Sequence, residues 1–189
     1  FRLADIVNGL NLQMFLYLFN VCADGSNPYA GVPAGVLYMH AARSVMTVET
    51  KSSAEKDIAG QEDKAFGMNG IVITNPDCDI PAAMEHDLAG KYIPVRLKKS
   101  GVGGSLASLE QLGLLQRKIE ALVADMGNAL QNGQIGQHPV QAKDHDKTCE
   151  YCDFASVCAF KKSVTPRTYD DQTDSAVLAE LEKEGENHA

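Results

Sequence analysis

The chain has 189 residues, of which 44% are hydrophobic, and its 17 Lys and Arg against 25 Asp and Glu give a formal net charge of −8. A chain of this size and composition can form one globular domain with a real core, or a small domain with extensions. The negative balance argues against a domain that holds nucleic acid by bulk charge alone. The stretch Arg96-Leu97-Lys98-Lys99 could still line a local basic groove, with a solvated face as the alternative.

Membrane and secreted classes of protein are not expected either. No apolar run is long enough to span a bilayer, and the first residues lack the basic and apolar pattern of a signal peptide. Five cysteines make an odd number, whereas secreted disulfide scaffolds carry an even number in a shorter chain. We therefore expect a reducing, cytoplasmic setting.

Apolar periodicity and turn residues predict alternating helices and strands. In chain order they predict a helix over Leu10 to Val21, a strand over Pro33 to His40 buried on both faces, a helix within Ser53 to Phe66, a break at Asn69-Gly70, a strand over Ile71 to Thr74, a short helix capped by Asn75-Pro76-Asp77, an extended stretch over Tyr92 to Leu97 and a flexible loop over Ser100 to Ser105. In the first helix, Leu12, Phe15, Leu16 and Phe19 are expected to form the buried face.

The clearest predicted helix runs from Ser108 to Asn132. Ser108 and Gln111 have the spacing of a capping box, and Gly133 is suited to end the helix. One stripe of apolar residues follows its length: Leu112, Leu115, Ile119, Leu122, Met126 and Leu130. Such periodicity predicts a core-facing helix and not a cofactor site.

Cys149, Cys152 and Cys158 form a C-x2-C-x5-C pattern. The close pair lets two sulfurs reach one metal from a tight turn, and a helical turn over Phe154 to Val157 would bring the third back. Zinc sites and iron–sulfur clusters take four ligands, so either one ligand is missing or the thiols form a reduced, structural group. His145 is a candidate fourth ligand for zinc.

Gln13 and Tyr17 are four residues apart on the first predicted helix and share one face. An amide and a phenol on an otherwise apolar helix need polar partners. Backbone groups can provide those partners, and so can a functional site. The residues alone leave both interpretations open.

Several stretches together resemble one known family. Gly9 to Leu18 resembles the Q-x3-Y helix of RecB-like nucleases of the PD-(D/E)XK superfamily, and Pro33 to His40 is similar to the strand that follows it. The stretches Ile93-Pro94-Val95 and Ser105 to Gln111 resemble later landmarks, and the three cysteines resemble those of the iron–sulfur subset. The resemblance extends over residues 1–162, and these residues most resemble the C-terminal nuclease domain of AddB-type subunits.

This resemblance implies an α/β fold, namely a partial PD-(D/E)XK, restriction-endonuclease-like core over residues 1–162. The core would carry a C-terminal cysteine-rich extension at 149–158. The resemblance also implies a role in an ATP-dependent DNA helicase–nuclease that degrades DNA ends during double-strand break repair. An AddA-like subunit would be its partner. Residues 163–189 lie beyond the resemblance, and their polar composition predicts a tail whose end, Asp174 to Glu184, is either a surface helix or frayed.

The resemblance also implies a mechanism and two cofactors. Carboxylates hold Mg²⁺ for hydrolysis of DNA phosphodiesters, Gln13 positions a phosphate or a metal-bound water, and Tyr17 fixes that geometry. Cys149, Cys152 and Cys158 would bind a [4Fe–4S] cluster, with a fourth cysteine outside this chain.

The chain also departs from the family pattern. No D-x-K motif precedes Gln13, which lies only twelve residues after Phe1. We therefore expect a fragment that begins just past the active-site strand, is inactive alone, holds a cluster poorly and self-associates through exposed apolar surface. The alternatives are a zinc-binding module, a structural or interaction domain, and a CRISPR-associated RecB-like exonuclease. The last is disfavoured by the polar insert Val45 to Phe66.

Overall fold

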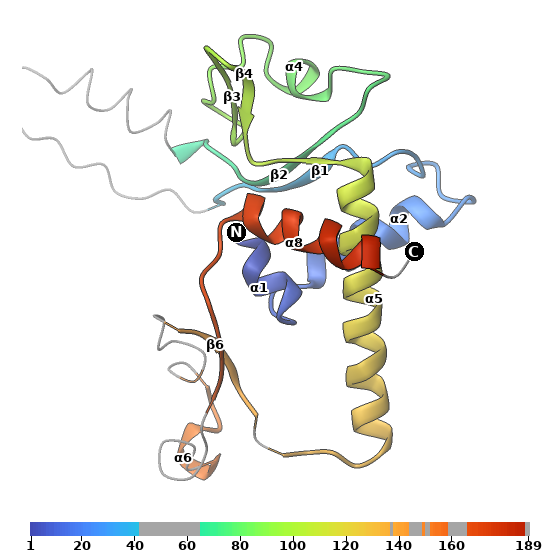
Figure 1. Cartoon of the computed structure of the whole chain (residues 1–189), viewed down its shortest axis with the longest axis vertical. Coiled ribbons are helices and arrows are strands. Elements are labelled where there is room, and N and C mark those ends of the chain that lie inside the picture. Colours follow the sequence, from blue (N-terminus) through green and yellow to red (C-terminus); the bar gives the residue numbers. More distant parts are fainter. Residues whose placement is uncertain (42–64, 137, 144–148, 150–151, 159–165, 188–189) are drawn as a thin grey trace, which may run out of the picture. The chain divides into compact units, whose positions relative to one another are not determined.

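The computed structural model describes residues 1–41, 65–136, 138–143, 149, 152–158 and 166–187, and it is mixed α/β (Figure 1). The described chain divides into two compact units. The first unit comprises Phe1 with Met14–Leu112, and the second comprises Arg2–Gln13 with Gly113–Ala189. Most of the helix expected within Ser53 to Phe66 lies outside the described residues, as does the predicted domain boundary at residue 162.

A three-stranded sheet forms the centre of the first unit. Its strands are β1 (Gly35–Tyr38), β2 (Asn69–Thr74) and β5 (Leu106–Ser108), in the order β1-β2-β5. Strand β1 is antiparallel to β2, whereas β5 is parallel to it. The central strand is buried because Ile71, Val72 and Ile73 are almost fully shielded from solvent.

A hairpin and a short helix also belong to the described part of the first unit. The hairpin pairs β3 (Val95–Lys98) with β4 (Gly101–Gly104) in antiparallel register. Helix α4 (Ile80–Met84) begins after Asp79, whose side chain accepts a hydrogen bond from the Ala82 N–H. The predicted cap at Asn75-Pro76-Asp77 is therefore wrong.

The first predicted helix starts later than expected. Helix α2 spans Gln13–Ala23, because Asn11 has a φ of 56° and the chain turns there after the short helix α1 (Leu3–Val7). Phe15 is the buried residue of α2, and its ring packs against those of Phe1 and Phe19. The expected burial of Leu16 is wrong, because that side chain is exposed.

Three predictions about strands are also corrected. Strand β1 is not buried on both faces, since Val36 is its only buried residue. Asn69 and Gly70 do not break the chain but begin β2. The expected loop over Ser100 to Ser105 contains β4, whose glycines pair with β3.

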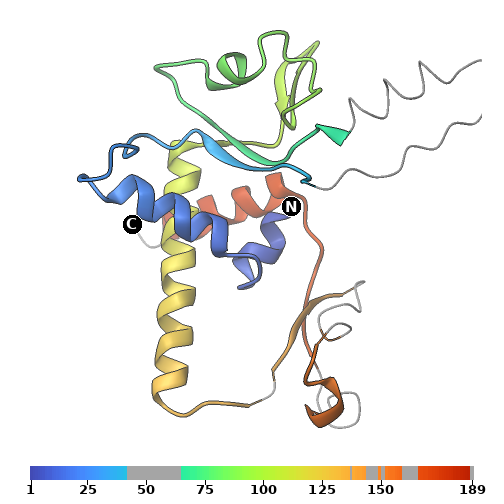
Figure 2. The same ribbon diagram turned by 180° about the vertical axis from the view of Figure 1, so that it is seen from behind.

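The second unit is assembled from both ends of the chain. It contains α1, most of α5 (Leu109–Gln131), β6 (Val140–Ala142), α6 (Ala155–Cys158), β7 (Arg167–Tyr169) and α8 (Asp174–Asn187). Strands β6 and β7 are parallel. Helices α1 and α8 lie side by side (Figure 2), and Leu3, Ile6, Val177, Leu178 and Leu181 are buried. The C-terminal helix is therefore neither frayed nor purely a surface helix, because it has a buried apolar face.

Both ends of α5 match the sequence prediction. Ser108 Oγ accepts from the Gln111 N–H at 3.1 Å, and Gln111 Oε1 accepts from the Ser108 N–H at 2.8 Å, which is a capping box. At the other end the Gly133 and Gln134 N–H groups donate to the carbonyls of Leu130 and Ala129, as in a Schellman motif.

The apolar stripe of α5 is only partly core. Leu112, Leu115 and Ile119 are buried, but Leu130 is 70% exposed. The predicted core therefore ends about halfway along the helix, within the part of the chain that the structure describes. Self-association through such apolar surface stays a prediction. No helix of the described residues is long and apolar enough to cross a membrane.

Candidate functional site

Gln13 and Tyr17 lie on the same helix, α2, one turn apart. The left-handed residue Asn11 sets the turn that places Gln13 at the first position of this helix. Both side chains are exposed, and that of Tyr17 is 55% exposed. An amide and a phenol are therefore exposed one turn apart on α2, and their catalytic role stays a prediction from the family resemblance.

Glu85 is a buried carboxylate in the first unit that the sequence did not single out. Its oxygens accept hydrogen bonds from the N–H groups of Lys91, Tyr92 and Ile93 at 2.9, 3.0 and 3.1 Å. Burial opposes ionisation, but these backbone donors and that of Gly90 outweigh it and lower the pKa of Glu85. The carboxylate thus fixes the chain that leads into the β3–β4 hairpin.

No sequence signal distinguishes Glu85 from a surface acid. Its partners lie six to eight residues later, a separation that matches neither helical nor strand periodicity. These hydrogen bonds to Glu85 form only once the intervening chain has turned back on itself.

The cysteine segment forms a turn followed by one helical turn. The Cys152 N–H donates to the Cys149 carbonyl at 3.4 Å, which closes a turn, and α6 forms the single helical turn that ends at Cys158. The Cys158 N–H donates to the Phe154 carbonyl at 2.8 Å. His145 lies outside the described residues.

None of these three cysteines is part of a disulfide bond within the described residues. Within the described ranges, no three His, Cys, Asp or Glu side chains are grouped so that they could hold a metal ion. The donor type suits an iron–sulfur cluster, but three thiols are one fewer than such a cluster usually takes. The described residues therefore do not form a complete cluster site.

Mg²⁺ is likewise not accommodated by the described residues. This ion prefers carboxylate oxygens, whereas Gln13 and Tyr17 offer an amide and a phenol. Without grouped carboxylates in the described part of the chain, no step of hydrolysis can be derived through a metal from these residues.

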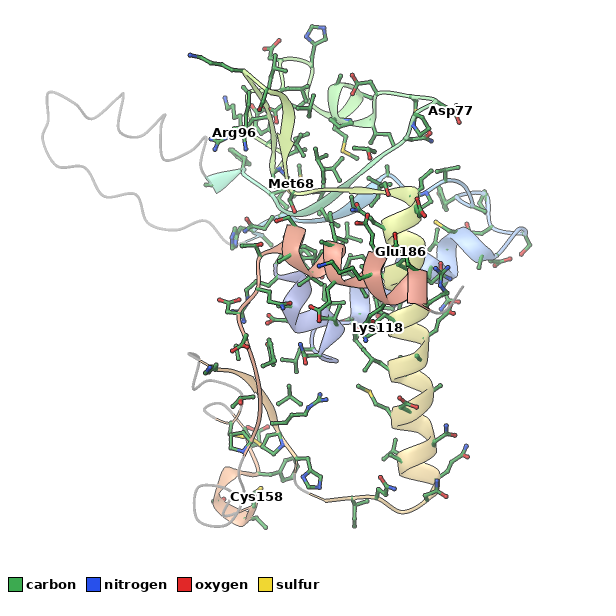
Figure 3. The ribbon with its side chains drawn as sticks, viewed as in Figure 1. Met68, Asp77, Arg96, Lys118, Cys158 and Glu186 are labelled. Carbon is green, nitrogen blue, oxygen red and sulfur yellow. The ribbon has the colours of Figure 1, made fainter. Side chains whose placement is uncertain are left out.

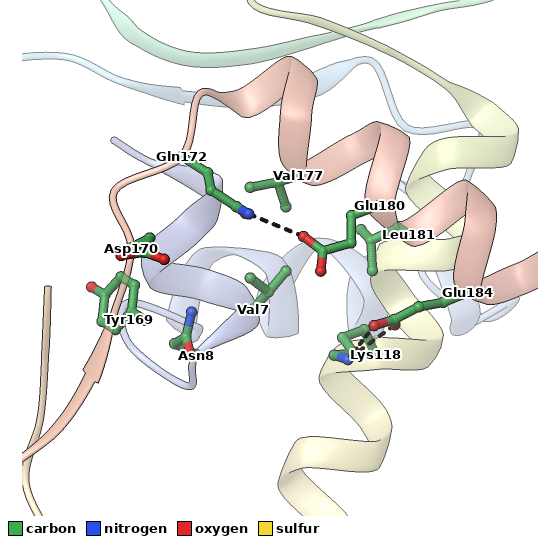
Figure 4. A pocket seen from close by; sticks show the side chains of 10 residues that line it. All are labelled: Val7, Asn8, Lys118, Tyr169, Asp170, Gln172, Val177, Glu180, Leu181 and Glu184. Carbon is green, nitrogen blue, oxygen red and sulfur yellow. Dashed lines mark hydrogen bonds and ion pairs between the residues drawn. The ribbon is translucent and has the colours of Figure 1, made fainter. Parts of the chain in front are cut away.

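The second unit has a cavity of about 250 Å³ (Figure 4). It is lined by Val7, Asn8, Lys118, Tyr169, Asp170, Gln172, Val177, Glu180, Leu181 and Glu184. Lys118 pairs with Glu184 at 3.1 Å, and Gln172 donates to Glu180 at 3.2 Å. Four of its polar side chains are thus paired with one another, and Asn8, Tyr169 and Asp170 bond to groups outside the lining.

Tyr169 at the edge of this cavity is part of a charged network. Its hydroxyl donates to Asp5 Oδ1 at 2.5 Å, and Arg2 forms an ion pair with the same carboxylate at 2.8 Å. Burial, together with the hydrogen bond to Asp5 and its negative charge, raises the pKa of Tyr169 to about 12. This network connects β7 to α1 and is structural.

Comparison with known proteins identifies relatives of the whole chain. Residues 2–159 match the model of the PD-(D/E)XK nuclease superfamily. The chain is 31% identical to an ATP-dependent helicase/deoxyribonuclease subunit from Oceanobacillus iheyensis, over 98% of this chain and 17% of that protein. It is 30% identical to the subunit of the same name from Bacillus thuringiensis strain Al Hakam, over 96% of this chain and 16% of the relative. The chain therefore spans a small part of these relatives.

Proposed function

Because the chain belongs to the PD-(D/E)XK nuclease superfamily, we propose that it contributes to the nuclease domain of an ATP-dependent helicase–deoxyribonuclease. Its substrate would be DNA, hydrolysed from its ends at the phosphodiester bonds. The observation that carries this proposal is the similarity over almost the whole chain to relatives named as helicase/deoxyribonuclease subunits.

Gln13 and Tyr17 are the residues that we assign to the substrate. The Gln13 amide can donate a hydrogen bond to a phosphate oxygen or a water, and the Tyr17 hydroxyl can hold that group from one turn further along α2. Their exposure leaves both side chains accessible to DNA. Mg²⁺ would act as the Lewis acid, and it would be bound by carboxylate side chains and not by Gln13 or Tyr17.

Further features of the proposal come from the family. An AddA-like subunit would be the partner, the process would be double-strand break repair, and the setting would be the cytoplasm. Cys149, Cys152 and Cys158 would supply three of four thiolates to a [4Fe–4S] cluster that ties the C-terminal segment to the domain. Such a cross-link would stabilise the domain without acting on the substrate.

The proposal is tested by Gln13→Ala and Tyr17→Phe in the full-length protein, with linear DNA and Mg²⁺. We expect Gln13→Ala to lower the rate of DNA hydrolysis by roughly 10- to 100-fold, because a misplaced reacting group costs this much. The Kd for DNA, measured in the presence of a chelator, should change little.

The matched controls are Gln131→Ala, an exposed glutamine on α5, and Tyr29→Phe, an exposed tyrosine outside the helices. Both should hydrolyse DNA at the wild-type rate. Equal losses of hydrolysis and binding in Gln13→Ala would assign this residue to binding or folding and would contradict the catalytic role.

A further inference from the structure

One hairpin of the first unit, together with the turn before it, carries a cluster of positive charge. Within the described residues of this unit, every Lys and Arg lies between positions 91 and 99: Lys91, Arg96, Lys98 and Lys99. All four are exposed. Arg96 marks this hairpin in Figure 3. In a chain with a net charge of −8, such a concentration is a local exception to the overall balance.

Two of these cations share a face of β3 that carries little else. Arg96 and Lys98 are two residues apart on the strand, so their side chains point to the same side. Their cross-strand partners are Gly103 and Gly101, which have no side chains. The aliphatic stem of Lys98 lies across Gly103, where an added Cβ would meet it at 3.2 Å.

Neither Arg96 nor Lys98 forms an ion pair with an acid of the described residues. Their charges are therefore available to an anion. Gly101, where an added Cβ would meet no other group within 4 Å, also lets a ligand approach the backbone of β4 closely.

The hairpin is anchored to the core of the first unit. Ile93 and Val95 are buried with Val72 and Leu88, and the Leu97 N–H donates to the Leu88 carbonyl at 2.8 Å. The three hydrogen bonds to Glu85 fix the turn that carries Lys91. A rigid support of this kind reduces the entropy that a surface loses when it binds a ligand.

An aromatic ring lies beside the cations. The Lys91 ammonium is 5.1 Å from the centre of the Tyr92 ring, and Tyr92 is 43% exposed. Basic residues combined with an exposed aromatic ring are typical of surfaces that bind single-stranded nucleic acid, where the cations follow the phosphates and the ring stacks on an unpaired base.

We propose that the basic hairpin, Lys91 to Lys99 with the glycine strand β4, is a contact surface for single-stranded DNA. Arg96, Lys98 and Lys99 bind successive phosphates, and Tyr92 stacks on a base, without reading the sequence. This inference rests on the proposed function only for the choice of DNA as the ligand. It assigns binding to an element distinct from α2, where Gln13 and Tyr17 lie.

The test is the double variant Arg96→Gln/Lys98→Gln in the full chain, with a single-stranded oligonucleotide and a chelator so that no hydrolysis occurs. The slope of log K against log salt should fall by about 0.7 for each charge removed. With two charges removed, the ratio of wild-type to variant affinity should be roughly 25-fold larger at 0.1 M salt than at 1 M salt. Tyr92→Ala should weaken binding to the single strand and leave binding to a duplex of equal length unchanged.

Arg117→Gln/Lys183→Gln is the matched control, since it removes one exposed Arg and one exposed Lys from helices of the second unit. Its affinity and salt slope should equal those of the wild type. Circular dichroism and Tm should be alike in the two double variants.

Wild-type affinity in the hairpin variant would overturn the inference and leave the proposed nuclease function standing. An equal loss of affinity in the hairpin variant and the control variant would also overturn it, because binding would then follow net charge. Loss of binding in the hairpin variant alone supports the inference even if Gln13→Ala leaves hydrolysis unchanged, a result that would contradict the proposed function instead.

Discussion

At the scale of single residues, Glu85 and the pair on α2 show what a sequence pattern can and cannot predict. Gln13 and Tyr17 were found because both lie on one helix at a fixed spacing, and the structure places both on α2. Glu85 was missed because its partners are set by the path of a turn and not by a repeat. Local spacing is readable from a sequence, whereas hydrogen bonds across an irregular turn are not.

Replacement of Glu85 by Gln should destabilise the first unit by about 2 kcal/mol, because buried N–H groups lose a charged acceptor. The measurement is urea denaturation near neutral pH. Glu110→Gln, at an exposed position on α5, is the control and should change the free energy of unfolding far less.

The same carboxylate predicts a pH dependence. Because folding lowers the pKa of Glu85, its contribution to stability is present above the ordinary value of 4.5 and is lost as the pH falls through the folded pKa. The wild type should therefore lose more stability on acidification than Glu85→Gln does. Parallel acid titrations of the two proteins would contradict this role.

At the scale of elements, the ends of the long helix α5 were predictable from the sequence, whereas the strand β4 of the glycine hairpin was not. The capping box and the glycine stop of α5 were confirmed because each involves only neighbouring residues. Strand β4 was expected to be a loop, because glycine composition indicates flexibility. Its pairing with β3 depends on main-chain hydrogen bonds, which cannot be recognised from the pattern of side chains.

The core prediction for α5 was right only for its first half. Periodicity shows which residues share a helix face, but it does not show how far along the helix other elements cover that face. Leu112, Leu115 and Ile119 are buried, and the described neighbours leave Leu130 exposed. An amphipathic stripe therefore predicts a face and not the extent of its burial.

The cysteine segment, residues 149–158, carries its own prediction at this scale. Its turn and one-turn helix carry three thiols, but in the described chain these are not grouped with one another or with a fourth ligand so as to hold a metal. We expect the 189-residue chain, purified without air, to lack stoichiometric iron and sulfide, whereas the full-length protein shows the broad visible absorption of a cluster. Cys152→Ala in the full-length protein should remove this absorption and lower Tm, as loss of a bound metal group does.

Cys22→Ala, a cysteine on α2, is the control and should retain both the absorption and Tm. Stoichiometric iron and sulfide in the 189-residue chain would mean that the fourth ligand lies within it. Cys78, which is exposed, would then be the first residue to replace.

At the scale of the whole molecule, the two units differ in how the chain builds them. The sheet and the hairpin of the first unit come from one nearly continuous stretch, whereas the second unit brings α1 together with α8 from opposite ends of the sequence. The Leu3 N–H donates to Asp174 Oδ1 at 2.8 Å, and the Tyr169–Asp5 hydrogen bond joins the same two ends. The sequence predicted the C-terminal helix but not this pairing, because its partner lies more than 160 residues away.

Leu181→Ala tests whether α8 holds the second unit together. Leu181 is buried on α8, so its truncation should cost about 2–5 kcal/mol. Amide hydrogen exchange should then accelerate in α1 and α8, which share this core, while Ile71 to Ile73 of β2 keep their protection. Val157→Ala, an exposed site in the same unit, should leave exchange unchanged. If β2 lost protection together with α1, the two units would unfold as one cooperative body, and the C-terminal helix would stabilise the sheet as well.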